Sequence, residues 1–211
     1  EAKKIKMSMN RRNFLRTTAT ATLAAPALIN QAFAGSHGPI KFVSILDQSG
    51  GLDIYGKPMV DATKMAIDEM NESGGLLGRE IELKIYDPQS SIQFYTQFAT
   101  QAAAGDKADV VHAGITSASR EAIRPTLSRY ETLYFYNTLY EGGVCDMNNF
   151  CTGSTPAQTV EKLVPYAMKK WGKKVYIVAA DYNYGHITAE WVQKYVRDNG
   201  GDPIEVEFFP L

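Results

Sequence analysis

Residues 39–47 read PIKFVSILD, an apolar and β-branched run that is followed directly by the polar sequence Gln48-Ser49-Gly50-Gly51. This pattern predicts a buried strand that ends in a loop. Apolar residues then recur at intervals of three and four from Met59 to Met70, with Pro58 suited to a first helical turn and Gly74-Gly75 as a stop. The stretch therefore predicts a strand, a polar loop and a covering helix.

The same alternation of strand and helix continues along the chain. Strands are expected over residues 80–87, 109–114 and 133–136, and helices over residues 91–104 and 117–130. The strand over 80–87 alternates apolar and polar residues, which is typical of an edge strand or a half-exposed strand. Strands that alternate with helices of this length predict a doubly wound parallel α/β sheet with right-handed crossovers.

A second series of elements begins at residue 156. Helices are expected over 156–170 and 186–199, and strands over 174–180 and 204–209. Two strands and two helices are too few to bury both faces of a sheet, so this second α/β lobe is interpreted as incomplete. We predict upstream residues and a signal peptide in 1–34, a first α/β lobe in 35–152 and the truncated start of a second lobe in 153–211, within a longer natural protein.

The signal is predicted from residues 7–34, which hold a basic start, a mildly apolar middle and the cleavage triplet Ala32-Phe33-Ala34. The run RRNFLR, residues 11–16, is typical of a twin-arginine signal. We therefore expect the twin-arginine export machinery as a partner and the periplasm as the destination. The alternative is a basic amphipathic N-terminal helix. Residues 1–6 precede a plausible start at Met7 and are left out of the fold prediction.

Composition excludes several classes of protein. Hydrophobic residues make up 45% of the chain and charged residues 21%, as in ordinary water-soluble globular proteins. The longest apolar stretch, residues 19–33, is interrupted by polar residues and falls short of the roughly 18 apolar residues of a membrane span. After Ala34 the chain holds 16 basic and 22 acidic residues, a net charge near −6 that argues against a nucleic-acid partner.

The two cysteines, Cys145 and Cys151, are read together with the predicted export. Disulfides persist outside the cytoplasm, and two cysteines without a nearby histidine at ligand spacing do not assemble a four-ligand zinc site. We predict a local disulfide between Cys145 and Cys151, with two buried reduced thiols as the alternative. No metal or other cofactor is expected.

Candidate binding residues follow from the strand ends. In open α/β sheets, ligands lie beyond the carboxyl ends of the strands. Ser117 and Ser119 fall where a helix begins, so their hydroxyls and the free backbone N–H groups suit a carboxylate or a carbonyl oxygen, with simple helix capping as the alternative. Tyr136 and Tyr182 are placed to close on a small ligand from two sides, with packing at a strand end as the alternative.

The common sequence signatures of catalytic sites are missing from the chain. The sequence contains no G-x-S-x-G elbow, no Walker A loop, no G-x-G-x-x-G and no H-E-x-x-H. The three histidines, His37, His112 and His186, are scattered along the chain. These observations predict a binding protein rather than an enzyme.

Several motifs resemble a known family. The runs GITSASR (114–120), YFY (134–136) with YEG (140–142), and TGSTPAQ (152–158) resemble type I periplasmic solute-binding proteins of ABC transporters. The urea and short-chain-amide binders are most similar, and the branched-chain amino-acid binders are next. Residues 71–79, 180–182 and 208–211 add further similarity in the same order.

The resemblance implies two α/β lobes that close on a small polar solute, such as urea, an amide or an amino acid, and deliver it to ABC permease subunits in the membrane. The family's ligand positions fall on Ser117, Tyr136 and Thr138 in the first lobe and Tyr182 in the second, with Ser119, Ser49 and Gly50 as nearby candidates. Ile115 stands where the urea and amide binders carry an aromatic residue, so the choice of solute stays open. A cytoplasmic amide-sensing regulator of the same fold and an exported α/β enzyme are the competing functions.

Overall fold

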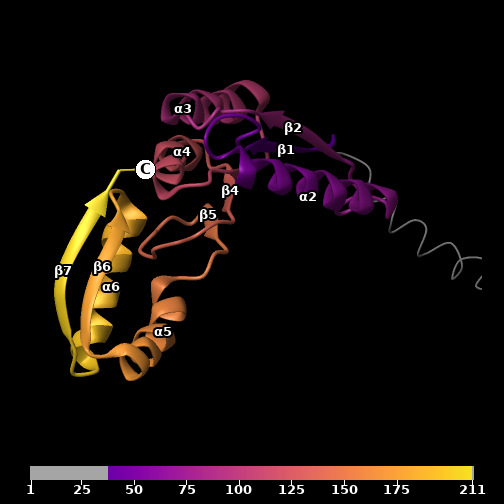
Figure 1. Ribbon diagram of the computed structural model, residues 1–211. Coiled ribbons are helices and arrows are strands. Elements are labelled where there is room, and N and C mark those ends of the chain that lie inside the picture. The colour runs from indigo at the N-terminus through magenta and orange to yellow at the C-terminus, as the bar shows by residue number, and fades with distance from the viewer. Residues whose placement is uncertain (1–37, 211) are drawn as a thin grey trace, which may run out of the picture.

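The computed structural model describes residues 38–210, and the predicted signal over residues 7–34 lies outside them. The strands are β1 (Ile40–Ile45), β2 (Ile81–Tyr86), β3 (Val110–Ala113), β4 (Leu133–Tyr136), β5 (Asn149–Cys151), β6 (Lys174–Ala180) and β7 (Asp202–Phe209). The helices are α2 (Asp53–Glu72), α3 (Ile92–Thr100), the π-helical turn η1 (Gln101–Asp106), α4 (Ser117–Arg129), α5 (Pro156–Trp171) and α6 (Asn183–Asp198). Figure 1 shows this alternation of strands and helices, which confirms the predicted α/β class.

Five strands form one sheet in the order β2-β1-β3-β4-β5, and all of its neighbouring pairs are parallel. The edge position of β2 confirms the prediction from its alternating pattern. The chain winds away from β1 in both directions, which creates a topological switch point between β1 and β3. In open parallel sheets, the crevice outside the carboxyl ends of the strands at such a point is where ligands bind.

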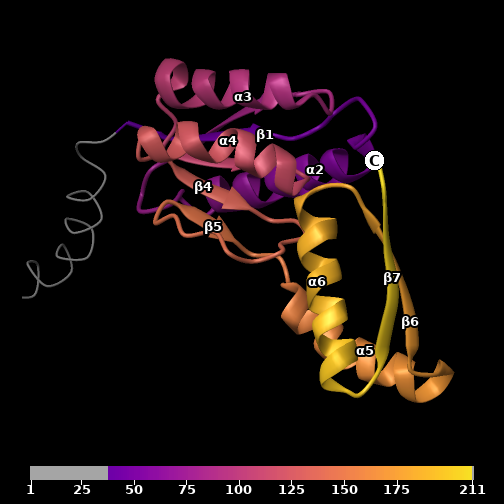
Figure 2. The ribbon, with the colours of Figure 1, turned by 90° about the vertical axis from the view of Figure 1, so that its left-hand side faces the viewer.

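Helices cover both faces of this sheet, as Figure 2 shows. On one face, α3, η1 and α4 bury the main core with side chains such as Val43, Val111 and Ile123. On the other face, α2 packs through Val60 and Ile67 onto smaller apolar clusters. The sheet is therefore held between two helical layers, and its strand ends stay fixed in position.

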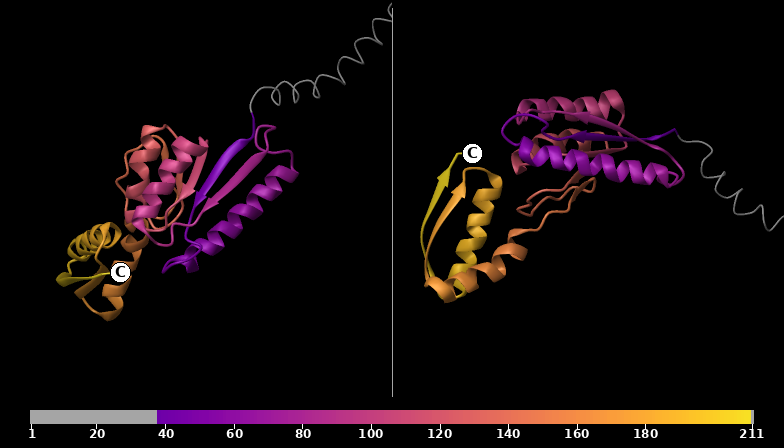
Figure 3. Two further views of the ribbon diagram at one scale, coloured as in Figure 1. Left: turned by 90° about the horizontal axis from the view of Figure 1, so that it is seen from above. Right: turned by 45° about the vertical axis from the view of Figure 1, so that its right-hand side comes forward.

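A second unit contains the two-stranded parallel sheet β6–β7 with α5 and α6. The two helices pack against each other and α6 packs on the sheet, through an apolar cluster that includes Val164, Met168 and Val196. The other face of this sheet carries exposed side chains such as Val178 and Phe209. Figure 3 shows both helices on a single side of the two strands.

Two predicted helix starts were wrong, and one strand was missed. Helix α2 begins at Asp53, so Pro58 lies inside the helix and not in its first turn. Helix α6 begins at Asn183, three residues before the predicted start at His186. The three-residue strand β5 was not predicted, because its pairing with β4 is set by tertiary structure and not by an apolar run.

The predicted disulfide between Cys145 and Cys151 was also wrong, because both cysteines are free thiols. Cys151 lies in β5 opposite Tyr136, packs against the main core, and its thiol contacts Asn149 Oδ1 at 3.5 Å. Cys145 lies in the loop before β5 and is exposed to solvent. Strand pairing thus holds one thiol at the core while the other faces water.

Candidate functional site

A cluster of three hydroxyl groups lies beyond the carboxyl ends of β3 and β4. The Tyr136 hydroxyl donates to the backbone carbonyls of Ile115 at 3.2 Å and Leu139 at 2.9 Å. The Thr138 hydroxyl donates to the same Ile115 carbonyl at 2.8 Å. Burial raises the pKa of Tyr136 to about 12, and the nearby hydroxyl groups of Thr138 and Ser117 work against this rise. The structure thus brings together Ser117, Tyr136 and Thr138, which the sequence placed in one site.

The turn between β3 and α4 positions the first of these hydroxyls. Gly114 adopts a φ of +83°, which lets the chain turn sharply after the strand. Thr116 caps the helix by accepting from the Ser119 backbone N–H at 3.1 Å. The Ser119 hydroxyl accepts from the backbone N–H groups of Ile115 and Thr116 and donates to the Thr116 carbonyl. Ser119 therefore serves the helix cap, while Ser117 at the first helical position is directed elsewhere.

Ser117 is bound to a buried ion pair that was not predicted from the sequence. Its hydroxyl donates to Glu141 Oε2 at 2.6 Å, and Arg120 donates through Nη1 to Oε2 at 3.0 Å and through Nη2 to Oε1. The side chains of Arg120 and Glu141 are each 2% exposed. Burial alone would raise the pKa of Glu141, but the hydrogen bonds from Arg120 and Ser117 outweigh it and hold the pKa below its ordinary value. Glu141 is therefore an ionised carboxylate that only accepts hydrogen bonds.

The guanidinium of Arg120 also contacts two aromatic rings and a second carboxylate. Its carbon lies 5.0 Å from the ring centre of Tyr136 and 5.2 Å from that of Tyr140, and its Nε donates to Glu121 Oε1 at 3.0 Å. Burial works to lower the pKa of Arg120, and the contacts with Glu141 raise it above its ordinary value. Arg120 and Glu141 fall inside the motifs GITSASR and YEG, which is the sequence signal that could have pointed to them.

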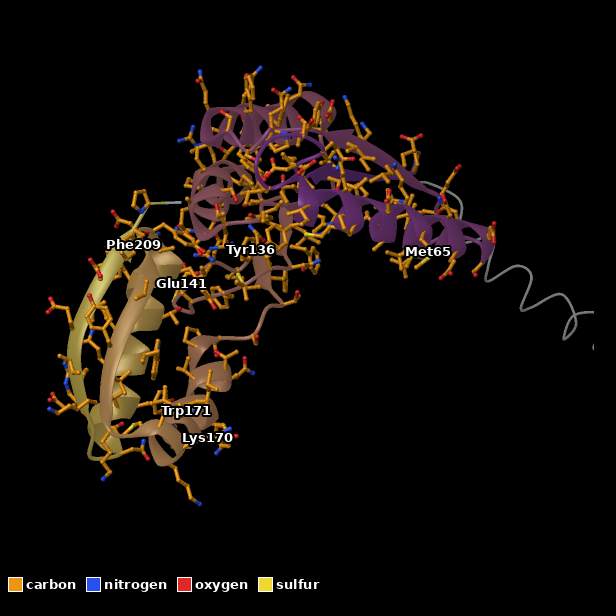
Figure 4. The ribbon with its side chains drawn as sticks, viewed as in Figure 1. Met65, Tyr136, Glu141, Lys170, Trp171 and Phe209 are labelled. Atoms are coloured by element: carbon orange, nitrogen blue, oxygen red, sulfur yellow. The ribbon has the colours of Figure 1, made fainter. Side chains whose placement is uncertain are left out.

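The second unit faces this cluster through the start of α6. Burial raises the pKa of Tyr182, and the fields of Tyr184, Glu141 and Tyr55 raise it further. Tyr182 thus shares one region with two side chains of the first unit, of which Tyr55, an exposed residue in α2, was not predicted. Figure 4 shows Tyr136 and Glu141 on the side of the five-stranded unit nearest α6.

A cavity of about 400 Å³ joins the two units beside the ion pair. It is lined by Arg120 and neighbouring side chains of α4, by residues 141–145, and by Asn183 at the start of α6. The cavity therefore spans the boundary between the units and includes the carboxylate that holds Ser117.

Ser49 and Gly50 lie in the loop after β1, where each makes close contacts with the loop after β2. The Ser49 hydroxyl donates to Asp87 Oδ2 at 2.7 Å. Gly50 has a φ of +89°, and a Cβ on it would lie 2.7 Å from the backbone of Gln89. These contacts fasten the loop after β1 to the loop after β2, and the role of Ser49 and Gly50 in ligand binding stays a prediction.

Metal-binding and membrane-spanning arrangements are both missing from residues 38–210. No group of three or more His, Cys, Asp and Glu side chains there is arranged to hold a metal ion. Over the same residues, none of the helices combines the length and the apolar character that crossing a membrane requires.

A parallel sheet between helical layers, with hydroxyls at its strand ends and a second α/β unit across a cavity, defines a two-unit binding fold. Residues 40–211 match the family described as periplasmic binding protein domain, and the chain belongs to this family.

Solved structures give the same result for the fold. The chain is similar to LivJ, the branched-chain amino acid transporter substrate-binding protein from Streptococcus pneumoniae in complex with isoleucine, with 21% identity and a TM-score of 0.70. It is also similar to a solute-binding protein of an ABC transporter from Rhodopseudomonas palustris in complex with 3,4-dihydroxybenzoic acid, with 20% identity and a TM-score of 0.72. The two matches cover 82% of this chain and 50% and 47% of those chains, respectively.

These similarities confirm the type I periplasmic-binding-protein fold that the motifs suggested. The chain spans about half the length of the solved proteins it matches.

Proposed function

We propose that this protein is the solute-binding component of an ABC transporter, which captures a small neutral amide or urea between two lobes and delivers it to permease subunits. The observation that carries this proposal is the cluster of Ser117, Tyr136 and Thr138 at the carboxyl end of the sheet, opposite Tyr182 of the second unit. Similar proteins hold isoleucine or an aromatic acid, which supports a solute-binding role.

The direction of the hydrogen bonds supports an amide as the ligand. The hydroxyl hydrogens of Ser117, Tyr136 and Thr138 all point to oxygen atoms that only accept, namely the Glu141 carboxylate and backbone carbonyls. A hydroxyl whose hydrogen is engaged in a donated hydrogen bond still has oxygen lone pairs. Toward a ligand, all three hydroxyl oxygens can therefore act only as acceptors. The hydroxyls therefore suit a ligand that brings N–H groups.

The start of α4 supplies the complementary donors. Backbone N–H groups in the first turn of a helix lack intrahelical partners and attract oxygen atoms. An amide or urea matches both the donors and the acceptors of the site, because its carbonyl accepts from the helix terminus while its NH₂ donates to the hydroxyl oxygens. A carboxylate has no hydrogen to give to those oxygens, and Arg120 is already paired with Glu141.

Closure of the two units accounts for capture. Side chains of both units line the cavity, so a hinge motion that narrows it would enclose a solute between the units. Recovery of the ligand unchanged after binding would distinguish this receptor from an exported α/β enzyme, because an enzyme would return a product.

Export by the twin-arginine route is part of the proposal and separates it from a cytoplasmic regulator. The double substitution Arg11→Lys and Arg12→Lys is expected to leave the precursor in the cytoplasm, with periplasmic fractions depleted of mature protein. Export of this variant at the normal level would reject the twin-arginine assignment.

The binding site is tested by Thr138→Val, which removes one acceptor oxygen and nearly keeps the shape of the side chain. Loss of one hydrogen bond corresponds to about 1 kcal/mol, so calorimetry should show roughly a fivefold weaker affinity for acetamide. Thr152→Val is the matched control, because Thr152 is exposed and its hydroxyl donates to Asn137. An unchanged affinity in Thr138→Val would place the ligand elsewhere.

A further inference from the structure

Glu141 occupies a position that the proposed binding role does not yet explain. Its carboxylate lines the cavity between the units, and it also accepts from the Ser117 hydroxyl at 2.6 Å. A buried carboxylate is costly to desolvate, and an apolar pair of similar volume often serves stability as well as a buried ion pair does. The contact with Ser117 gives the charge at this position a use beyond stability.

We propose that Glu141 is a positioning residue that sets the ligand preference of the site. Because Glu141 accepts the hydrogen bond from the Ser117 hydroxyl, Ser117 Oγ can act only as an acceptor toward a ligand. The site therefore selects ligands that present N–H over ligands of the same shape that present a carboxylate oxygen. This inference rests on the proposed solute-binding function and names the residue that determines which solutes are accepted.

The geometry keeps Glu141 from turning away from Ser117. Two donors of Arg120 reach the two carboxylate oxygens, and such a two-point contact fixes the plane of the carboxylate. The rings of Tyr136 and Tyr140 in turn hold the guanidinium. Glu141 is only 4% exposed, so its carboxylate depends on Ser117 and Arg120 for hydrogen bonds more than on solvent.

Only an acceptor without hydrogens has this effect. A glutamine at position 141 carries an NH₂ that can donate to Ser117 Oγ, which frees the Ser117 hydrogen to point at a ligand oxygen. Glu141→Gln should therefore change the direction of one hydrogen bond in the site while the volume of the side chain is kept.

Acetamide and acetate are the probes, because the two molecules share size and shape. Acetamide carries an NH₂ group where acetate carries a charged oxygen. Calorimetric titration of the protein at its full natural length gives the ratio of the two dissociation constants. Glu141→Gln is expected to shift this ratio toward acetate by at least about tenfold, the size of one hydrogen bond that involves a charged group. A residue that only maintains the fold would weaken both ligands by the same factor.

Glu121→Gln is the matched control. Glu121 also accepts from Arg120, but Ser117 does not donate to it. Removing its charge is expected to leave the acetamide-to-acetate ratio unchanged, so a shift of equal size in Glu121→Gln would show that local charge, and not the Ser117 hydrogen, sets the preference. That result would overturn the inference.

A second variant covers the case in which Glu141→Gln does not fold. Arg120→Gln combined with Glu141→Gln removes both charges, so no buried charge is left without a partner. The ratio should shift toward acetate in this variant as well. If the wild-type protein binds acetamide and the ratio is unchanged in the folded variant, the inference about Glu141 is overturned alone. If the wild-type protein binds neither acetamide nor urea, the proposed function is overturned and the inference with it.

Discussion

Ser117 Oγ donates a 2.6 Å hydrogen bond to Glu141 Oε2, although the two residues are 24 positions apart in the chain. Ser117 opens α4 after β3, and Glu141 follows β4, so the neighbouring parallel strands bring them to the same edge of the sheet. This contact links a residue of the candidate site to a buried ion pair. The proposed role of Glu141 in setting the hydrogen-bonding character of the site rests on this contact.

The ion pair leads to a prediction about stability. Arg120→Met leaves Glu141 buried without its cation, so the free energy of unfolding should fall by about 3–5 kcal/mol. Guanidinium chloride denaturation measures this change and avoids urea, which is a candidate ligand. Lys57→Met is the control, because Lys57 pairs with Asp53 on the exposed surface of α2 and such surface pairs contribute little to stability. Equal losses in the two variants would contradict the buried pair.

The burial of the His112 imidazole predicts how the stability of the protein depends on pH. The side chain is 6% exposed, its Nδ1 lies 3.2 Å from Thr63 Oγ1, and its Nε2 has no hydrogen-bond partner within residues 38–210. Burial lowers the pKa of His112 from 6.5 to about 4. The unfolded chain therefore binds this proton more readily, and stability is lost as the pH falls from 6.5 toward 4.

The expected loss for His112 is about 2 kcal/mol between about pH 7 and pH 5. Chemical denaturation at several pH values measures it. His112→Phe should remove this loss, whereas the control His186→Phe, at an exposed position, should retain it. A wild-type stability that stays level over this range would contradict the neutral buried imidazole.

The close approach of α2 to β1 predicts a strong effect at Gly56. A Cβ at this position would lie 1.9 Å from the Asp47 backbone carbonyl. Gly56→Ala should therefore destabilise the protein by about 2 kcal/mol or more, even though alanine is ordinarily favoured over glycine in a helix by about 1 kcal/mol. Gly51→Ala is the control, because nothing lies within 4 Å of its added Cβ. Thermal unfolding of both variants provides the comparison.

The free cysteines predict a thiol-labelling pattern. Cys145 is exposed and should react rapidly with a thiol reagent in the native protein. Cys151 should react slowly, because burial raises the pKa of its thiol. Both should react in denaturant without any reductant, as mass spectrometry would show. Labelling that requires prior reduction would restore the disulfide between these residues.

Much of the fold was predictable because the decisive patterns are local. The apolar run at residues 39–47 predicted β1, and the alternation over residues 80–87 predicted β2 at the edge of the sheet. The start of α2 was not predictable from Pro58, because the five residues before it also adopt helical geometry. Strand β5 was missed because its three residues depend on pairing with β4.

The candidate site was predictable in part for the same reason. Strand-end rules and the family motifs singled out Ser117, Tyr136 and Thr138, which the fold brings together. The pairing of Arg120 with Glu141 depends on two adjacent strand ends, so each residue alone looks like an ordinary surface charge. Their places inside two motifs are the only mark that the pair leaves in the sequence.

The most direct test of the proposed function is a calorimetric titration of the mature protein, at its full natural length, with acetamide, urea, acetate and leucine. We predict saturable binding of acetamide or urea, recovery of that ligand unchanged, and acetate at least about tenfold weaker, because each acceptor hydroxyl that meets a carboxylate oxygen loses a hydrogen bond. Binding of acetate as tight as that of acetamide, selective binding of leucine, or conversion of a ligand would contradict the proposed function.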